Sequence, residues 1–368
     1  MQIPIFRGGG CMKKVKLGEI CEIVTGSTPK SSNPNYWNGE YKWITPAEIS
    51  DDDFIVFDTQ RKITKLGIEE TGLKSFPTGT VLLSSRAPIG KVAISGCEMY
   101  CNQGFKNFIC SNKINNEYLY YFFKSRKNYL NILGRGATFK EISKSIVSDI
   151  EIFLPTYGIQ RKQVKVLKKI DKLIYTRKEQ LIEFEYLVKS RFNEMFGDFY
   201  TTLFPKYKIG EKFELSSGST PSRDNKLYWD SGTINWVKTT EVINKEITET
   251  EEKITKFALE STSLKLFPVN TILIAMYGQG QTRGRSAILK VESTSNQACG
   301  AIFPNKIDNP VFIWHQLMLR YSELRELGRG GNQPNLNGQL IKNFELILPP
   351  LSLQNEFADF VAQVDKSQ

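Results

Sequence analysis

Short apolar runs alternate with turn-forming residues through most of the chain, which is typical of short strands packed on a core. The runs Thr80–Ser84 and Thr271–Met276 are apolar at most positions and predict buried strands. Glu117–Lys124 and Val311–Leu327 predict helices instead. This mixture indicates an α+β fold. Further strands are predicted at Trp43–Ile44, Val92–Ile94 and Phe108–Ile109, and turns at Asn38–Gly39, Pro77–Gly79 and Pro88–Gly90.

A helical pattern follows Leu154 and Pro155 and continues to about Phe196 without a proline. Its apolar residues recur at intervals of three and four, which predicts a coiled-coil seam. The segment after Pro350 repeats the pattern over about half the length. We expect the two helices to pair; two ordinary amphipathic helices in a globular core are the alternative. The predicted pairing residues are Leu167, Ile170, Ile174, Leu181, Leu353, Phe357, Phe360 and Val364.

The chain is an internal duplication. Gly26–Pro29 and Gly218–Pro221 are both Gly-Ser-Thr-Pro, and similar pairs recur along the chain at shifts of 191 to 194 residues. A period of this size is domain-sized and too long for a solenoid repeat. Other pairs are Tyr36–Trp37 with Tyr228–Trp229, Trp43 with Trp236, Lys62–Lys65 with Lys253–Lys256, Asn102–Gln103 with Asn296–Gln297, Gly134–Gly136 with Gly328–Gly330, Leu154–Pro155 with Leu348–Pro349, and Gln160 with Gln354.

The repeat predicts two similar domains in tandem, each followed by a helix. We expect the two domains at residues 1–155 and 199–349, a long helix at 156–198 and a short or truncated one at 350–368. Met12 precedes two lysines, as a natural start would, so residues 1–11 are a candidate non-native leader. They lack the basic start and apolar stretch of a signal peptide.

Charge favours a polyanionic partner. The 368 residues carry 49 Lys and Arg against 39 Asp and Glu, a net charge of +10. Residues 160–191 alone hold ten basic and four acidic side chains. A basic helix face of this kind suits DNA phosphates or an acidic partner, although a solvated face is the simpler reading.

Few residues could support catalysis or a structural metal. The six cysteines form no CxxC motif and His315 is the single histidine. The chain therefore has few of the side chains that a zinc site or a His-activated nucleophile needs. His315 lies in an apolar helical stretch and is expected to pack. The thiols are expected to be reduced, which favours a cytoplasmic location.

The sequence contains no phosphate-binding GxxxxGK[ST] motif. Asn33–Tyr36, Asn-Pro-Asn-Tyr, faintly echoes the Asn-Pro-Pro-Tyr motif of amino methyltransferases. Its counterpart Asn225–Tyr228, Asn-Lys-Leu-Tyr, breaks that pattern.

Three loops in each repeat carry groups suited to DNA. Hydroxyls, amides and cations can position phosphates, while Arg, Lys and Gln can read base edges. The loop after the buried strand differs far more between the repeats than its flanks do, as two readers of different sequences would require; loop drift is the alternative. The candidate DNA-binding residues are Ser27, Thr28, Lys30, Arg86, Lys91, Arg135 and Lys140 in the first repeat, and Ser219, Thr220, Arg223, Tyr277, Gln279, Gln281, Arg283, Arg285, Arg329, Asn332 and Gln333 in the second.

In the order of its motifs, the chain resembles the DNA-specificity subunits of Type I restriction–modification enzymes. The residues that carry this resemblance are the duplicated Gly-Ser-Thr-Pro with Tyr-Trp, Ser84–Gly90, Asn102–Phe105, Thr138–Ser143, and Ile152–Pro155 with Gln160.

The resemblance implies two mixed α/β target-recognition domains, each followed by a helix, with the helices paired as an antiparallel coiled coil in pseudo-two-fold symmetry. Each domain would read one half of a bipartite DNA site. The subunit itself would be non-catalytic and bind no cofactor. It would hold two methyltransferase subunits, which use S-adenosylmethionine, and where present two restriction subunits, which use ATP and Mg. A solitary adenine methyltransferase and a coiled-coil adaptor without a DNA role are the alternatives.

Overall fold

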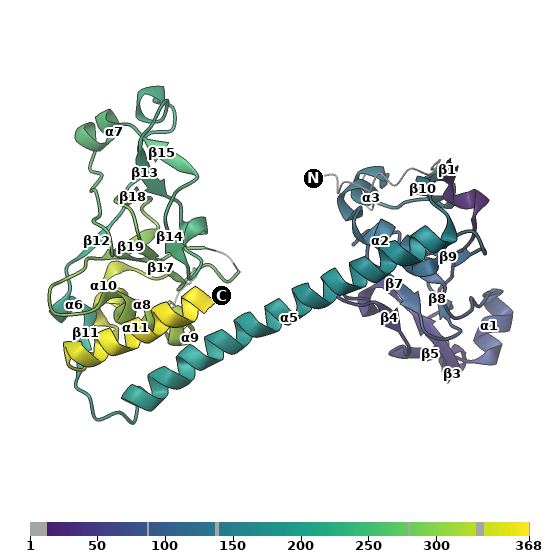
Figure 1. Ribbon diagram of the computed structural model, residues 1–368, viewed down its shortest axis with the longest axis horizontal. Coiled ribbons are helices and arrows are strands. Elements are labelled where there is room, and N and C mark those ends of the chain that lie inside the picture. Colours follow the sequence, from purple (N-terminus) through teal and green to yellow (C-terminus); the bar gives the residue numbers. More distant parts are fainter. Residues whose placement is uncertain (1–12, 87, 137–139, 279, 329–334, 368) are drawn as a thin grey trace. The chain divides into compact units, whose positions relative to one another are not determined.

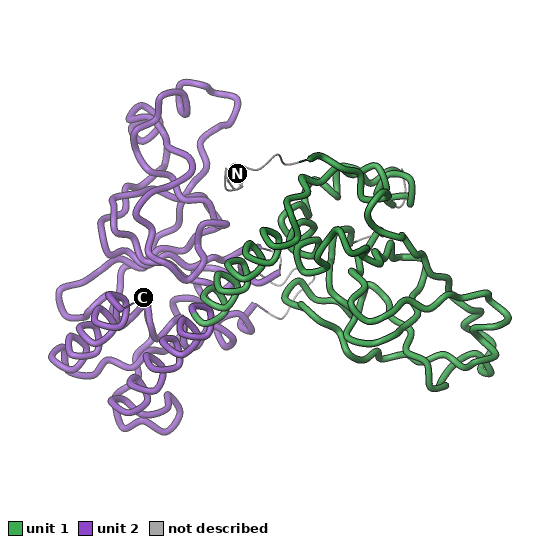
Figure 2. Tube along the Cα trace, turned by 45° about the vertical axis from the view of Figure 1, so that its right-hand side comes forward, with its two compact units in different colours: residues 1–176 green, residues 177–368 purple. Residues whose placement is uncertain are grey.

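The computed structural model describes residues 13–86, 88–136, 140–278, 280–328 and 335–367. The chain forms two compact units, Met1–Thr176 and Arg177–Gln368 (Figure 2). Each unit is described by itself below. Within the described ranges, no helix combines the length and apolar character of a membrane span.

Unit 1 contains a five-stranded sheet, a three-stranded sheet and a two-stranded ribbon. The five-stranded sheet has the order β2 (Cys21–Val24), β9 (Phe105–Cys110), β6 (Val81–Ser84), β7 (Val92–Ser95), β4 (Ile55–Val56). The three-stranded sheet has the order β5 (Arg61–Ile63), β3 (Trp37–Ile44), β8 (Tyr100–Cys101), and the ribbon pairs β1 (Lys13–Lys16) with β10 (Glu151–Leu154). The helices are α1 (Lys65–Thr71), α2 (Asn116–Lys124), α3 (Lys127–Leu133) and α4 (Lys144–Ser148), with 3-10 turns η1 (Leu17–Glu19), η2 (Pro34–Tyr36) and η3 (Pro46–Glu48). Helix α5 (Tyr157–Phe196) begins in unit 1 and ends in unit 2.

Unit 2 repeats this topology strand for strand. Its five-stranded sheet has the order β12 (Leu215–Ser217), β19 (Cys299–Ile302), β16 (Ile272–Ala275), β17 (Ser286–Leu289), β14 (Glu246–Ile247), and its three-stranded sheet the order β15 (Glu252–Ile254), β13 (Ile234–Val237), β18 (Ser293–Ser295). The ribbon pairs β11 (Lys206–Lys208) with β20 (Glu345–Ile347). The helices are α6 (Ile209–Lys212), α7 (Lys256–Ser261), α8 (Pro310–Leu319), α9 (Tyr321–Glu326), α10 (Gly338–Asn343) and α11 (Leu351–Ser367), with η4 (Lys226–Tyr228) and η5 (Thr239–Glu241).

The central strands β6 and β16 are buried on both faces, which explains their continuous apolar runs. In β6, Val81 and Leu83 face a core that includes α2, while Leu82 faces a second core on the other side of the sheet. In β16, Ile272 and Ile274 share a core with α8, while Leu273 belongs to the opposite core.

A buried glutamine fixes the start of the helix that follows each repeat. In α5, Gln160 accepts a hydrogen bond from the Asn115 N–H at 2.8 Å and donates to the Pro155 carbonyl at 2.8 Å. In α11, Gln354 accepts from the Asn309 N–H at 2.9 Å and donates to the Pro349 carbonyl at 2.8 Å. The recurring Leu-Pro and Gln thus fix the first turn of each helix to the domain that precedes it.

The two helices do pair, but α5 contributes other residues than predicted. Figure 1 shows α11 running back along the last turns of α5. There Phe357 meets Phe192 with ring centroids 5.4 Å apart, and Arg191 forms an ion pair with Glu356 at 2.8 Å. On the α11 side, the predicted residues Leu353, Phe357, Phe360 and Val364 all face this core.

The predicted residues on α5 lie earlier in the helix and need correction. Leu167 packs on the core of unit 1, whereas Ile170, Ile174 and Leu181 are 44%, 51% and 45% exposed. The apolar face rotates slowly around the helix, because a 3.6-residue helix drifts against a heptad repeat. The residues that pair with α11 therefore come later, at Val188, Phe192 and Phe196.

The predicted Asn38–Gly39 turn is also wrong. Both residues lie inside β3, where the register with β5 shifts between Trp37 and Tyr41. Asn38 has φ of 62°, so this is a bulge in a strand. Bulges and turns share the same residue preferences, which is why the dipeptide misleads.

Candidate nucleic-acid interface

The loops after β6 and β16 leave the sheet through the same hydrogen bonds. In unit 1, the Ser84 N–H donates to the Lys91 carbonyl at 2.9 Å; in unit 2, the Ala275 N–H donates to the Arg285 carbonyl at 2.9 Å. The equivalent glycines close both stems, since Gly90 and Gly284 have φ of 91° and 85°. From Ser84 to Lys91 is seven positions and from Ala275 to Arg285 is ten, so the loops differ in their tips.

Two other loops are tied to the first residue of each tip. In unit 1, the Ser85 N–H donates to the Gly104 carbonyl at 2.7 Å, and the Ser85 carbonyl accepts from the Ile142 N–H at 2.9 Å. In unit 2, Met276 makes the same pair of bonds with Ala298 and Leu336, at 2.8 and 2.9 Å. Two of the predicted loops and the segment that precedes β9 or β19, all distant in sequence, are thereby gathered at one end of the five-stranded sheet.

The Gly-Ser-Thr-Pro loop joins the same group through an exposed glutamine. The Thr28 hydroxyl donates to the side chain of Gln103, and the Thr220 hydroxyl donates to that of Gln297. Two tryptophans bond to these loops. The indole N–H of Trp43 donates to the Ser27 carbonyl at 3.2 Å, and that of Trp236 donates to the Ser219 carbonyl at 3.0 Å.

We call the resulting surfaces loop cluster 1 and loop cluster 2. Loop cluster 1 comprises the described residues within 27–30, 85–91, 102–104 and 135–141. Loop cluster 2 comprises the described residues within 219–223, 276–285, 296–298 and 328–336.

A carboxylate organises the cations of loop cluster 1. Glu141 pairs with Arg86 at 2.9 Å and with the nearly buried Lys106 at 3.2 Å. Burial alone would raise the pKa of Glu141, but its bonds to Lys106 and Arg86 hold that pKa below the ordinary value. Backbone bridges pair Glu141 with Arg86 on one side and with Arg135 on the other, so the two predicted arginines flank this residue.

Helix α9 braces the tip in loop cluster 2. The Arg325 guanidinium donates to the carbonyls of Gly280 and Arg283, the latter at 3.2 Å. The Tyr321 hydroxyl donates to the Gln281 carbonyl at 2.7 Å, and Arg285 donates to the Gln281 side chain at 2.8 Å. The loop is therefore a pre-formed surface that exposes Tyr277 and Gln281.

Comparison with known proteins identifies the scaffold. The family model for the Type I restriction modification DNA specificity domain matches residues 11–185 and again residues 203–368. The chain belongs to the Type I restriction–modification DNA-specificity family.

Individual relatives agree with this assignment. The MjaIX specificity subunit of a Type I restriction enzyme from Methanocaldococcus jannaschii is 30% identical over 372 residues, covering 95% of this chain and 85% of the relative. The EcoR124I/EcoR124II specificity subunit of Escherichia coli is 25% identical over 160 residues, covering 43% of this chain and 40% of the relative. A crystal structure of a Type I S subunit from M. genitalium matches the fold with a TM-score of 0.59 at 14% identity, covering 99% of this chain and 92% of that one.

Most of the predicted DNA-binding residues lie in loop cluster 1 or loop cluster 2. Lys30, Arg135 and Lys140 are exposed, while Lys91 donates to the Pro46 carbonyl at 3.2 Å. Of the other predictions, Gln279, Arg329, Asn332 and Gln333 lie outside the described residues.

Arg283 is a correction. Its side chain is only 7% exposed, and its repeat partner is the buried core residue Ile89. The tip of loop cluster 2 is three residues longer, so the shift between the repeats changes within the loop and the equivalence of Arg283 with Ile89 appears only on counting back from Gly90 and Gly284. Arg283 fills the base of the loop and is dropped from the interface.

Sequence reasoning missed two residues of the loop clusters and one residue beside them. Gln103 and Gln297 are exposed and follow equivalent asparagines, so the repeat itself could have revealed them. Arg61 was also missed: its Cζ lies 3.6 Å from the ring centroid of Trp37. Arg61 carried no signal, since the equivalent residue of the second repeat is Glu252.

The residues considered for catalysis or metal binding have structural roles instead. The Asn33 side chain accepts from the Asn35 N–H at 3.1 Å and caps η2, and Asn225 caps η4 in the same way. His315 packs edge-on against Phe357, and burial lowers its pKa to about 4. The described residues contain no group of three His, Cys, Asp or Glu side chains suited to a metal ion.

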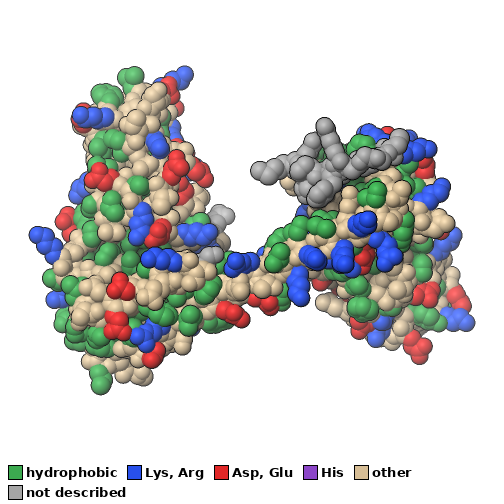
Figure 3. Space-filling model, in the orientation of Figure 1, with side chains coloured by type: hydrophobic (Ala, Val, Ile, Leu, Met, Phe, Trp, Pro, Cys, Tyr) green, Lys and Arg blue, Asp and Glu red, His purple; other side chains and the backbone are tan. Residues whose placement is uncertain are grey.

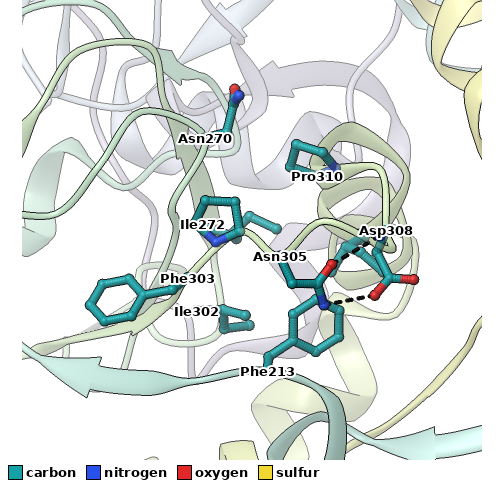
Figure 4. A pocket seen from close by; sticks show the side chains of 10 residues that line it. Phe213, Asn270, Ile272, Ile302, Phe303, Asn305, Asp308 and Pro310 are labelled. Atoms are coloured by element: carbon teal, nitrogen blue, oxygen red, sulfur yellow. Dashed lines mark hydrogen bonds between the residues drawn. The ribbon is translucent and has the colours of Figure 1, made fainter.

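A small pocket in unit 2 offers little room (Figure 4). It holds about 10 Å³, enough for one water molecule at most. Its polar side chains bond to each other, since Asn305 donates to the Asp308 carboxylate at 2.8 Å. This pocket is therefore a packing feature and not a ligand site.

Proposed function

We propose that loop cluster 1 and loop cluster 2 each read one half of a bipartite DNA site. The observation that carries the proposal is the pair of identical loop stems with unlike tips. Stem hydrogen bonds repeat from Ser84 to Ala275, whereas one tip carries Arg86 and the other Tyr277 and Gln281. A shared scaffold with different polar tips is what recognition of two different half-sites requires.

The long helix would set the distance between the half-sites. Figure 3 shows Lys and Arg side chains along α5. Exposed cations recur there at three- and four-residue intervals, so they share a face that suits DNA phosphates or an acidic partner. They are Lys162, Lys165, Lys169 and Lys172.

The chain would act within a larger complex. By family membership, it would hold two methyltransferase subunits, which use S-adenosylmethionine to methylate adenine, and where present two restriction subunits, which use ATP and Mg. It would contribute specificity and no catalytic residue. Such a complex acts on DNA in the cytoplasm.

The first experiment is to co-express the chain with the methyltransferase encoded beside it and map methylated adenines in the host DNA. A split motif with a fixed gap, lost when this chain is omitted, supports the proposal. A continuous motif, or methylation that persists without this chain, contradicts it. The latter outcome leaves a coiled-coil adaptor. S-adenosylmethionine binding by the purified chain alone would instead favour a solitary methyltransferase.

Loop variants then assign the halves. Gln281→Ala should relax base preference in one half of the mapped motif, and Arg86→Ala in the other, because each tip belongs to one unit. Both variants affecting the same half would contradict the proposal. Lys245→Ala, on an exposed loop of unit 2 outside the loop cluster, is the control and should leave both halves unchanged.

A further inference from the structure

An arginine lies over paired tryptophans in unit 1. Trp37 and Trp43 meet edge to face with centroids 4.9 Å apart, and Arg61 Cζ lies 3.6 Å from the Trp37 centroid and 5.1 Å from that of Trp43. Arg61 comes from β5 and is exposed. Stacking occupies the face of a guanidinium and leaves the N–H groups at its edge able to donate.

Unit 2 has the same cluster, but its arginine comes from another part of the chain. Trp229 and Trp236 lie 5.0 Å apart, and Arg223 Cζ is 3.9 Å from the Trp229 centroid and 4.7 Å from that of Trp236. Arg223 belongs to the loop before η4, where unit 1 has Ser31. Where unit 1 has Arg61, unit 2 has Glu252.

The arginine over the tryptophans stands at different sequence positions in the two repeats, and this difference bears on its role. Here two unrelated backbone positions deliver a guanidinium to the same rings. The guanidinium at that place, and not the sequence position, is therefore the shared feature.

The cluster adjoins the interface. The Trp37 indole N–H donates to the Lys30 carbonyl at 3.3 Å, and that of Trp229 donates to the Ser222 carbonyl at 3.0 Å. Both acceptors lie in the Gly-Ser-Thr-Pro loops of the loop clusters. An anion bound at one of these arginines would thus lie beside the surface proposed to read bases.

The two arginines differ in their charged neighbours. Arg223 forms an ion pair with Glu252, and Lys238 pairs with Glu251 and Glu252. Bonds from Arg223 and then Lys238 hold the pKa of Glu252 below its ordinary value, so this carboxylate is charged at neutral pH. Unit 1 has Gln60 and Arg61 at the positions of these two glutamates, so the carboxylates that surround Arg223 have no counterpart at the equivalent positions of unit 1.

From this asymmetry we infer that Arg61 binds a backbone phosphate of the DNA, while Arg223, neutralised by Glu252, does not. The inference rests on the proposed function, since it extends the same interface. Phosphate binding at Arg61 would anchor the first half-site irrespective of base sequence. Recognition in the second unit would depend more on the tip of loop cluster 2.

The test measures DNA affinity against salt concentration for the complex of the full chain with its methyltransferase. One duplex carries the mapped split site and another carries an unrelated sequence. Affinity falls as salt rises, and each phosphate contact contributes about 0.9 to the size of the slope of log affinity against log salt. The size of this slope is what the variants below change. Arg61→Gln should lower that slope by about 0.9 and weaken binding about tenfold on both duplexes, because a charge-assisted bond is lost.

Matched variants separate phosphate binding from packing. Arg223→Gln removes the same stacking in unit 2 and should change the slope much less than Arg61→Gln does, whereas Glu252→Gln should steepen the slope by freeing Arg223. Arg61→Lys keeps the charge and should restore most of the slope. An unchanged slope in Arg61→Gln, or an equal loss in Arg223→Gln, overturns the inference. If the wild-type complex binds neither duplex, the proposed function fails instead.

Discussion

Asn131 and Arg325 are equivalent residues of the two repeats, and each donates a hydrogen bond to the carbonyl at the base of its recognition loop. Asn131 bonds to the Ile89 carbonyl at 3.2 Å, and Arg325 to the Arg283 carbonyl at 3.2 Å. The helix after the core thus braces the loop in both units. The longer side chain in unit 2 also reaches the Gly280 carbonyl, which the longer tip requires.

Arg325→Ala should loosen the tip of loop cluster 2 without unfolding unit 2. The change removes bonds to the Gly280 and Arg283 carbonyls, each with a net value of about 1 kcal/mol. Hydrogen exchange of the amides that follow Tyr277, including that of Gly284, should therefore accelerate at least about tenfold. Exchange measured by mass spectrometry on the full chain checks this.

The matched variant is Asn131→Ala. It should accelerate exchange near Ile89 and leave the tip of loop cluster 2 unchanged. Uniform acceleration throughout unit 2 in Arg325→Ala would mean that Arg325 supports the whole unit, and would contradict the bracing role.

Gly26 and Gly218 should not tolerate any side chain. A Cβ at Gly26 would lie 1.8 Å from the Cys101 carbonyl oxygen, and one at Gly218 would lie 2.1 Å from that of Ser295. Backbone must move to relieve such overlaps, so Gly26→Ala or Gly218→Ala should cost about 3 kcal/mol or more of unfolding free energy. Urea denaturation should show this loss in the unit that carries the change.

Gly158 and Gly338 provide the contrast. Both lie in the first turn of a helix with nothing within 4 Å of a built Cβ. Alanine at either position should be neutral or stabilise by up to about 1 kcal/mol, because helix propensity improves. If Gly26→Ala behaves like Gly158→Ala, the close approach of the two backbones is not required.

The duplication made most of the fold predictable. Apolar runs marked β6 and β16 because a strand buried on both faces must be apolar at nearly every position. Recurring loops located the surfaces around Arg86 and Gln281, and the fold confirmed two mixed α/β units with pairing helices.

What failed depended on tertiary neighbours. Periodicity assigns residues to a helix face but does not say which turns meet a partner, so Leu181 was placed in the seam in the position that Phe192 fills. Arg61 approaches Trp37 across the sheet, and no local pattern records such a contact. Arg283 was misplaced because loops of unequal length obscure equivalent positions.

His315 should make unit 2 less stable in mild acid. Burial lowers its pKa in the folded state to about 4, while the unfolded chain has the ordinary value near 6.5. Below pH 6.5 the unfolded state binds a proton that the folded state refuses, so stability is full at neutral pH and falls towards pH 4. Between pH 7.5 and pH 5 the loss is about 2 kcal/mol.

His315→Gln removes this titration and serves as the measurement. Urea midpoints of the wild type and the variant, compared at pH 7.5 and pH 5, should converge or cross as the pH falls. A difference that stays constant with pH would show that the pKa of His315 is the same in the folded and unfolded states, and would contradict the effect of burial.

Phe357 should contribute far more stability than the exposed residues of α5. Its ring contacts Phe192, Phe196 and Phe312 with centroids 5.4, 5.9 and 6.1 Å apart. Phe357→Ala would leave a cavity between α11 and the end of α5, at a cost of about 3–5 kcal/mol. Leu181 is 45% exposed, so Leu181→Ala should cost less than about 1 kcal/mol. Urea unfolding, followed by hydrogen exchange of peptides from unit 2, distinguishes the two. Equal losses would restore Leu181 to the helix seam, because only a residue enclosed by α11 could match the effect of Phe357.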